Sequence, residues 1–158
     1  MIPTINFFNS KENKKFLEQL NEQFGITKLP GKVTKIGKEK IFLFTGNLEE
    51  EKIMKMQRLI PIERIGIYLA KEFEGEYRLS IEGTQILKNQ ITKNVIELNE
   101  EQKETWMMGH ELLMKTDKKG FVIIKYREDM LGTGKASEEK IANFIPKSRR
   151  LKDKTIEK

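Results

Sequence analysis

The chain has 158 residues, and 30 Lys and Arg against 24 Asp and Glu give it a formal net charge of +6. It has no Cys and a single His, which excludes disulfides, Cys-based metal sites and thiolate nucleophiles and leaves the imidazole without a metal-binding partner. No apolar run reaches the ~20 residues of a membrane helix, and no signal-peptide pattern opens the sequence. We therefore expect a cytoplasmic protein that needs no metal or other cofactor.

The first half predicts a compact α/β unit with an antiparallel sheet. Ser10 is the expected cap of its first helix, Gly25 ends that helix, and Pro61 ends the second one. The expected elements in chain order are a helix at 10–24, strands at 33–36 and 40–45, a helix at 48–59, strands at 65–73 and 76–79, and a helix at 80–87.

The second half has a different rhythm, and the polar segment 88–93 separates it from the first. Asn99 is the expected cap of its one helix, and Gly109 is the expected end. The expected elements are a strand at 95–98, a helix at 100–108, and strands at 110–115, 120–127, 130–135 and 140–145. One helix and a run of short strands predict a small, partly closed barrel. We expect an α+β fold with an α/β domain at 1–93 and a β pseudo-barrel at 94–158.

The order of the pieces in the second half is distinctive. The strand at 95–98 and the helix at 100–108 lead to GHELL at 109–113, and the strand at 120–126 leads to MLGTGKA at 130–136. In this order they resemble the PUA domain, a small RNA-binding pseudo-barrel. The resemblance implies that the second half binds RNA.

Two narrower resemblances point to ribosomal RNA. The ending NFIPKSRRL at 143–151 looks like the C-terminal RNA-binding domain of Fmu/Sun-type rRNA cytosine methyltransferases. The span 65–150 is similar to the Nip-seven-type ribosome-biogenesis factors, which pair an α/β domain with a C-terminal PUA domain. Methylation of cytosine at carbon five needs a thiolate, and the chain has no Cys, so we expect binding without catalysis.

Basic residues near the end of the chain are the main candidates for RNA contact. Between 147 and 158, six basic residues accompany two acids. Arg149 and Arg150 suit phosphates through forked hydrogen bonds, and Lys147 and Lys152 suit them as point charges. We expect these four side chains at an exposed edge of the barrel.

Further candidates lie elsewhere in the chain. Lys125 and Arg127 alternate along the expected strand at 120–127, which predicts a basic face opposite an apolar one. Lys135 is on the next strand, and Gly109 is at the end of the helix. Arg78 would serve if the RNA surface extends into the first half.

Three features invite a functional interpretation but favour a structural one. The sequence GTGK at 132–135 lacks the spacing of a phosphate loop, and we expect its glycines to let strands approach closely. Trp106 is expected to pack on the sheet, with base stacking as the alternative. His110 is expected to be partly buried near the end of the helix.

The leading hypothesis is therefore an rRNA-binding protein of ribosome biogenesis, with tRNA as another possible ligand. One alternative is an RNA-targeting subunit for a separately encoded rRNA or tRNA modification enzyme. Another is a protein-interaction module that binds no RNA. The apolar loop residues Phe7, Phe8 and Ile60 are candidates for contact with an assembly or modification partner.

Overall fold

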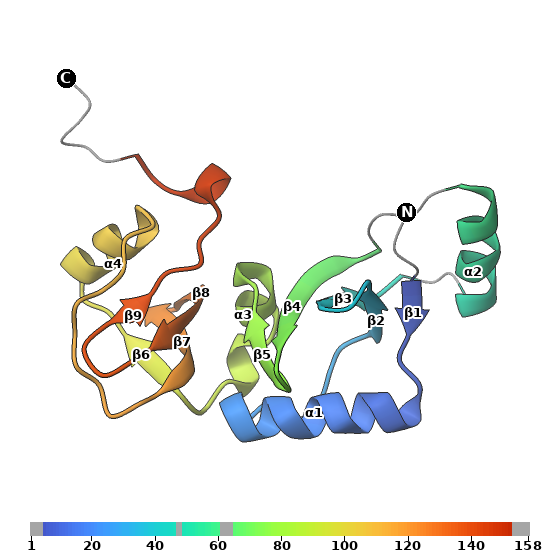
Figure 1. Ribbon diagram of the computed structural model, residues 1–158, viewed down its shortest axis with the longest axis horizontal. Coiled ribbons are helices and arrows are strands. Elements are labelled where there is room, and N and C mark those ends of the chain that lie inside the picture. The colour runs from blue at the N-terminus through green and yellow to red at the C-terminus, as the bar shows by residue number, and fades with distance from the viewer. Residues whose placement is uncertain (1–4, 47–48, 61–64, 153–158) are drawn as a thin grey trace.

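A computed structural model describes residues 5–46, 49–60 and 65–152, and it places two sheets side by side with α3 between them (Figure 1). The first half contains β1 (Ile5–Phe7), α1 (Ser10–Phe24), β2 (Lys32–Ile36), β3 (Lys40–Phe44), α2 (Glu50–Leu59), β4 (Ile67–Phe73), β5 (Glu76–Leu79) and α3 (Ile81–Ile86). The second half contains β6 (Val95–Glu97), α4 (Glu100–Met107), β7 (Gly120–Tyr126), β8 (Asp129–Ala136) and β9 (Ile141–Ala142), with short 3₁₀ turns at Lys88–Gln90 and Lys147–Arg149.

The described strands of the first half form an antiparallel sheet in the order β1-β2-β3-β4-β5. The cap of α1 is Asn9 and not Ser10, because the Asn9 side chain accepts from the Glu12 amide and the Glu12 side chain accepts from the Asn9 amide. Gly25 ends the helix as predicted, in a left-handed conformation with φ 83°. The expected start of α2 at residue 48, and Pro61 after it, lie outside the described residues.

The sequence did not predict β1, because three residues carry too little alternation to mark a strand. Phe7 lies on this strand and not in a loop, so that part of the prediction is wrong. Phe8 packs edge-on against Phe16, with ring centroids 5.8 Å apart, which leaves Ile60 as the exposed member of the three loop candidates, at 53% exposure.

The second half forms a curled half-barrel in the order β6-β7-β8-β9, where β6 and β7 are parallel and the other pairs are antiparallel. The expected strand at 110–115 is reduced to a single bridge between Leu112 and Ile141, and the strand at 140–145 to Ile141–Ala142. The ladder ends there because the Asn143 side chain, and not a neighbouring strand, bonds the backbone around it.

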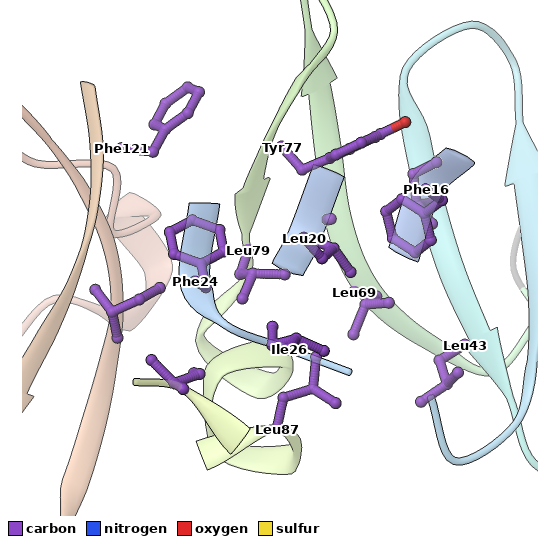
Figure 2. Packing of buried hydrophobic residues seen from close by; sticks show 14 of the residues in the cluster. Phe16, Leu20, Phe24, Ile26, Leu43, Leu69, Tyr77, Leu79, Leu87 and Phe121 are labelled. Atoms are coloured by element: carbon purple, nitrogen blue, oxygen red, sulfur yellow. The ribbon is translucent and has the colours of Figure 1, made fainter. Parts of the chain in front are cut away.

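A shared hydrophobic core joins the two halves. Figure 2 shows Phe24, Leu79 and Leu87 of the first half packed in one cluster that also includes Phe121 of β7. Val122, on the opposite face of β7, belongs to a second cluster around the fully buried Trp106. The strand β7 is therefore buried on both faces, and about 25 cal/mol for each Å² of apolar area removed from water stabilises the contact between the halves.

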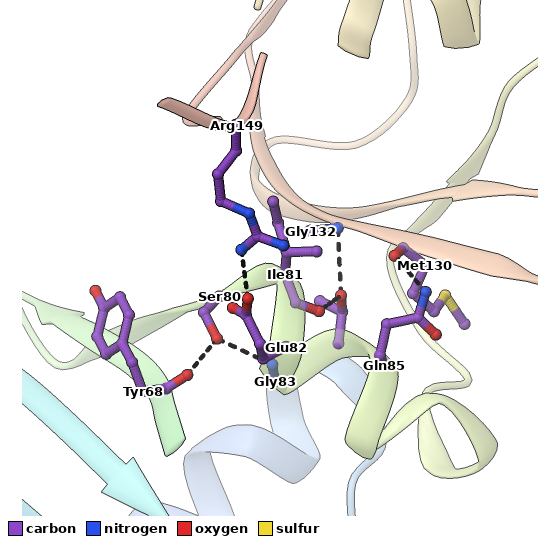
Figure 3. Close-up of polar contacts among 10 residues, drawn as sticks. Tyr68, Ser80, Ile81, Glu82, Gly83, Gln85, Met130, Gly132 and Arg149 are labelled. Atoms are coloured by element: carbon purple, nitrogen blue, oxygen red, sulfur yellow. Dashed lines mark hydrogen bonds and ion pairs between the residues drawn. The ribbon is translucent and has the colours of Figure 1, made fainter. Parts of the chain in front are cut away.

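Polar bonds cross the same contact. The Thr133 hydroxyl donates to the Leu79 carbonyl at 2.8 Å. The Gln85 side chain donates to the Met130 carbonyl at 3.0 Å (Figure 3). The Asn94 side chain donates to the Gln23 carbonyl at 2.5 Å. Buried polar groups of both halves thus satisfy one another, which fixes the position of β8 against α3 and β5.

Candidate nucleic-acid interface

The last described segment of the chain, residues 143–152, is anchored to the end of α4, and it is called the anchored end below. Gly109 follows this helix with φ 89°, and the Arg150 side chain lies so close to it that a Cβ on Gly109 would be 2.3 Å from the Arg150 Cδ. The Arg150 Nε donates to the Ile145 carbonyl at 3.0 Å, and the Leu151 amide donates to the Met107 carbonyl at 2.8 Å. Gly109 and Arg150, two predicted site residues, are therefore brought together.

The anchor depends on Asn143. Its side-chain amide donates to the carbonyls of Trp106 and His110, at 2.8 and 2.9 Å, and its oxygen accepts from the Ile145 amide at 2.8 Å. This role of Asn143 was not predicted, because an Asn before Phe-Ile-Pro carries no local signal for a partner 37 residues away. Asn143 holds the last segment of the chain against the second half.

The four basic candidates of this segment differ in what they contact. Lys147 and Lys152 are exposed, and neither forms an ion pair within residues 5–46, 49–60 and 65–152. Arg149 is exposed too, but it pairs with Glu82 of α3 (Figure 3). A phosphate could therefore approach either lysine without displacing an acidic side chain. At Arg149 the phosphate would compete with the Glu82 carboxylate.

The predicted basic face on β7 is wrong. Lys125 is half-buried on the strand, and the apolar residues at 121–124 are all buried, because one face of β7 packs on the first half. Arg127 lies beyond the strand in a turn with φ 53°, and its guanidinium carbon is 5.1 Å from the centre of the Tyr126 ring. The Lys103 amine is 5.0 Å from the same ring, so two cations share one aromatic group there.

Arg78 lies at the contact between the halves. Its guanidinium carbon is 5.2 Å from the centre of the Phe73 ring and 4.3 Å from the centre of the Phe144 ring. Phe121 lies beside both rings, with centroid distances of 5.8 and 6.3 Å, and the Lys135 amine is 5.7 Å from the Phe121 centroid. The structure thus brings two predicted site residues, Arg78 and Lys135, to one aromatic cluster.

No sequence pattern indicates this cluster, because its phenylalanines are scattered along the chain from 73 to 144. A small cavity of about 110 Å³ adjoins it, between β5, α3, β8 and the last segment. Its walls include Arg78, Ser80, Glu82, Phe144 and Arg149. The Ser80 hydroxyl is already used, because it donates to the Tyr68 carbonyl and accepts from the Gly83 amide (Figure 3).

The structural interpretations of the other features hold with one exception. The sequence 132–135 lies on β8, and Gly134 lets this strand approach Trp106, whose ring would be 2.7 Å from an added Cβ. Trp106 is fully buried and its Nε1 donates to the Leu131 carbonyl at 3.3 Å. His110 is exposed and not partly buried, and it follows Gly109, whose φ of 89° is not helical. Within the described part of the chain, no group of three or more His, Asp or Glu could hold a metal ion.

Comparison with known proteins finds a family for the second half. Residues 93–151 match the family described as the methyltransferase RsmF PUA domain. This match confirms the resemblance to the PUA domain of Fmu/Sun-type methyltransferases. The similarity to Nip-seven-type factors stays a prediction.

Curated relatives align with most of the chain. Ribosomal RNA small subunit methyltransferase F of Vibrio campbellii is 30% identical over 156 residues, which are 94% of this chain and 31% of the relative. The proteins of the same name are 28% identical over 140 residues in Aeromonas salmonicida (87% of this chain and 28% of the relative) and 27% identical over 116 residues in Vibrio vulnificus (73% and 23%). The chain therefore spans less than a third of the length of these relatives.

No helix among the described residues is both long and apolar enough to span a bilayer.

Proposed function

We propose, from the RsmF-type PUA domain that this chain carries, that it binds ribosomal RNA in the cytoplasm during ribosome biogenesis. The observation that carries the proposal is the anchored end of the chain, where Arg150 is fixed against Gly109 and Lys147 and Lys152 are exposed without ion pairs in the described part. Cations held at a fixed edge of a small barrel suit the phosphates of a folded RNA. The relatives' name supports small-subunit rRNA as the ligand, and tRNA would offer the same phosphate chemistry.

We propose further that these 158 residues bind without turnover. They contain no Cys to attack a pyrimidine ring, and they correspond to less than a third of the length of the relatives. The boundary between the two domains would lie near residue 93. The first half would stiffen the RNA-binding half through the shared hydrophobic core.

A second candidate function rests on the name of the relatives. They are named methyltransferases, so this chain would act as an RNA-targeting subunit for a separately encoded modification enzyme. That function predicts a stable complex with a catalytic chain and increased modification of RNA in its presence. The biogenesis function predicts co-sedimentation with pre-ribosomal particles instead.

The experiment that tests RNA binding is a salt series. The wild type and the double variant Lys147→Ala/Lys152→Ala are titrated with fragments of small-subunit rRNA. If each lysine contacts one phosphate, the slope of log affinity on log salt flattens by about 1.4 for single strands, at about 0.7 per contact. Both lysines are exposed, so we expect the double variant to keep the fold.

The matched control is Lys14→Ala/Lys15→Ala, which removes two exposed lysines from α1. Its slope should equal that of the wild type. A wild type that binds no RNA even at low salt would overturn the proposal and favour a protein-interaction module. Equal slopes for both double variants would move the RNA surface away from the end of the chain.

A further inference from the structure

Aromatic rings from both halves hold Arg78 in place. Phe73 ends β4 and Phe144 follows β9, and the Arg78 guanidinium lies within 5.2 Å of the one ring centre and 4.3 Å of the other. Phe121 of β7 supports both rings. Two rings this close restrict the position of the guanidinium and attract its charge, and its N–H groups are the donors that it can offer to a ligand.

The hydrogen-bonding groups of Arg78 are unused. Within the described residues the Arg78 side chain forms no hydrogen bond and no ion pair, although it is half-buried. Its direct cross-strand partner is Lys71, another cation, which pairs with Glu39 at 3.6 Å. Like charges directly opposite each other destabilise a strand pair, and partial burial of an unpaired charge adds to that cost. A cation fixed at this cost is a ready site for an anion from outside the chain.

The cavity beside Arg78 has the size and charge for such an anion. Its volume of about 110 Å³ holds several water molecules, and the Arg149–Glu82 pair lies on its wall. Lys135 is exposed at the edge of the same aromatic cluster. Phe73 and Phe144 are each partly exposed, so unpaired bases have aromatic surface beside the cavity on which to stack.

We infer that Arg78 binds a backbone phosphate of a single-stranded RNA segment that crosses from the anchored end of the chain to the first half. The two N–H groups of the guanidinium edge donate to two oxygens of one phosphate. This inference rests on the proposed function, and it adds a second contact site that belongs to neither half alone. A duplex does not suit this site, because its bases are not available to the exposed rings.

The first test compares Arg78→Gln and Arg78→Lys with the wild type, using a labelled single-stranded RNA oligonucleotide. The Gln variant should bind about tenfold more weakly and flatten the salt slope by about 0.7, because one charge-assisted phosphate contact is lost. The Lys variant keeps the slope, since the charge remains, but loses affinity with the forked geometry. A purely structural Arg78 gives a different result: the thermal midpoint falls while folded variants bind RNA as the wild type does. That outcome overturns the inference.

The second test works by gain of binding. Glu82→Gln releases Arg149 from its carboxylate partner on the cavity wall, so the RNA gains a contact and the salt slope steepens by about 0.7. The control Glu22→Gln removes the same charge from an exposed position on α1. If both variants bind RNA equally, the RNA does not reach the cavity and the inference is wrong.

Two further outcomes separate this inference from its premise and from a free anion. If Lys147→Ala/Lys152→Ala weakens RNA binding while Arg78→Gln does not, the proposed function stands and this inference fails. If inorganic phosphate shifts the Arg78 Nε–H resonance but Arg78→Gln leaves RNA affinity unchanged, the site takes a free anion and the RNA assignment is overturned.

Discussion

Replacing Gly109 by Ala tests whether this glycine is needed to make room for the Arg150 side chain at the anchored end. Two costs act together at this position. An L residue at φ 89° costs about 1–2 kcal/mol. The added Cβ would also be 2.3 Å from the Cδ and Nε of Arg150, so the side chain must move and its 3.0 Å bond to the Ile145 carbonyl is lost, at about 0.5–1.5 kcal/mol.

The sum is about 1.5–3.5 kcal/mol of unfolding free energy. In a domain of this size about 2–4 °C of thermal midpoint corresponds to each kcal/mol, so the midpoint should fall by about 3–14 °C. The measurement is urea and thermal unfolding of the variant and the wild type, followed by circular dichroism. The m-value, which is the slope of unfolding free energy on urea concentration, should be the same for both proteins.

A double-mutant cycle separates the two costs. In an Arg150→Ala background the clash is absent, so Gly109→Ala should cost only the backbone strain of about 1–2 kcal/mol. The coupling between the two positions is then about 0.5–1.5 kcal/mol. If Gly109→Ala costs the same in both backgrounds, or nothing in either, the close contact with Arg150 does not hold the end of the chain.

Three other substitutions probe the core and the anchor. Gly134→Ala places a Cβ 2.7 Å from the Cη2 of buried Trp106, so it should lower the unfolding free energy by about 1–3 kcal/mol. Urea unfolding followed by tryptophan fluorescence should then show a lower midpoint than in the wild type. Asn143→Ala removes both hydrogen bonds donated to backbone carbonyls near the end of α4, and a loss of about 1–3 kcal/mol by urea titration is expected. Burial, the charge of Glu72 and the hydrogen bond to it raise the pKa of Tyr77 far above its usual 10.0. A raised pKa gives stability that is complete below pH 10.0 and lost as pH rises further, so the wild type should lose stability above pH 10.0 more steeply than Tyr77→Phe does, and equal slopes would contradict this reasoning.

Local signals in the sequence predicted most elements of the fold. The stripe that ends at Phe24 and the glycine after it predicted α1, since apolar spacing and a left-handed stop are properties of neighbouring residues. Asn99 was correctly predicted as the cap of α4, and Trp106 as a residue packed on the sheet. The order of elements in the second half predicted the PUA-type fold that the family match confirms.

The errors arose where a residue's environment depends on distant segments. Arg127 was assigned to a strand face, although positive φ places it in a turn, and β7 was expected to have one open face. That face is closed because the first half of the chain packs on it, and alternation within seven residues carries no record of such a contact. The strand β1 was missed because its pairing with β2 spans the whole of α1.

The sequence by itself determined most element types, the basic end of the chain and the absence of thiol chemistry, because composition and local spacing decide these properties. Only the tertiary structure decided which cations are open to a ligand. Arg149 pairs with a carboxylate 67 residues away, while Arg78 is enclosed by rings from both halves and has no acid partner among the described residues. The charge of an arginine is a property of its own side chain, whereas its availability depends on the groups that folding brings within a few ångströms of it.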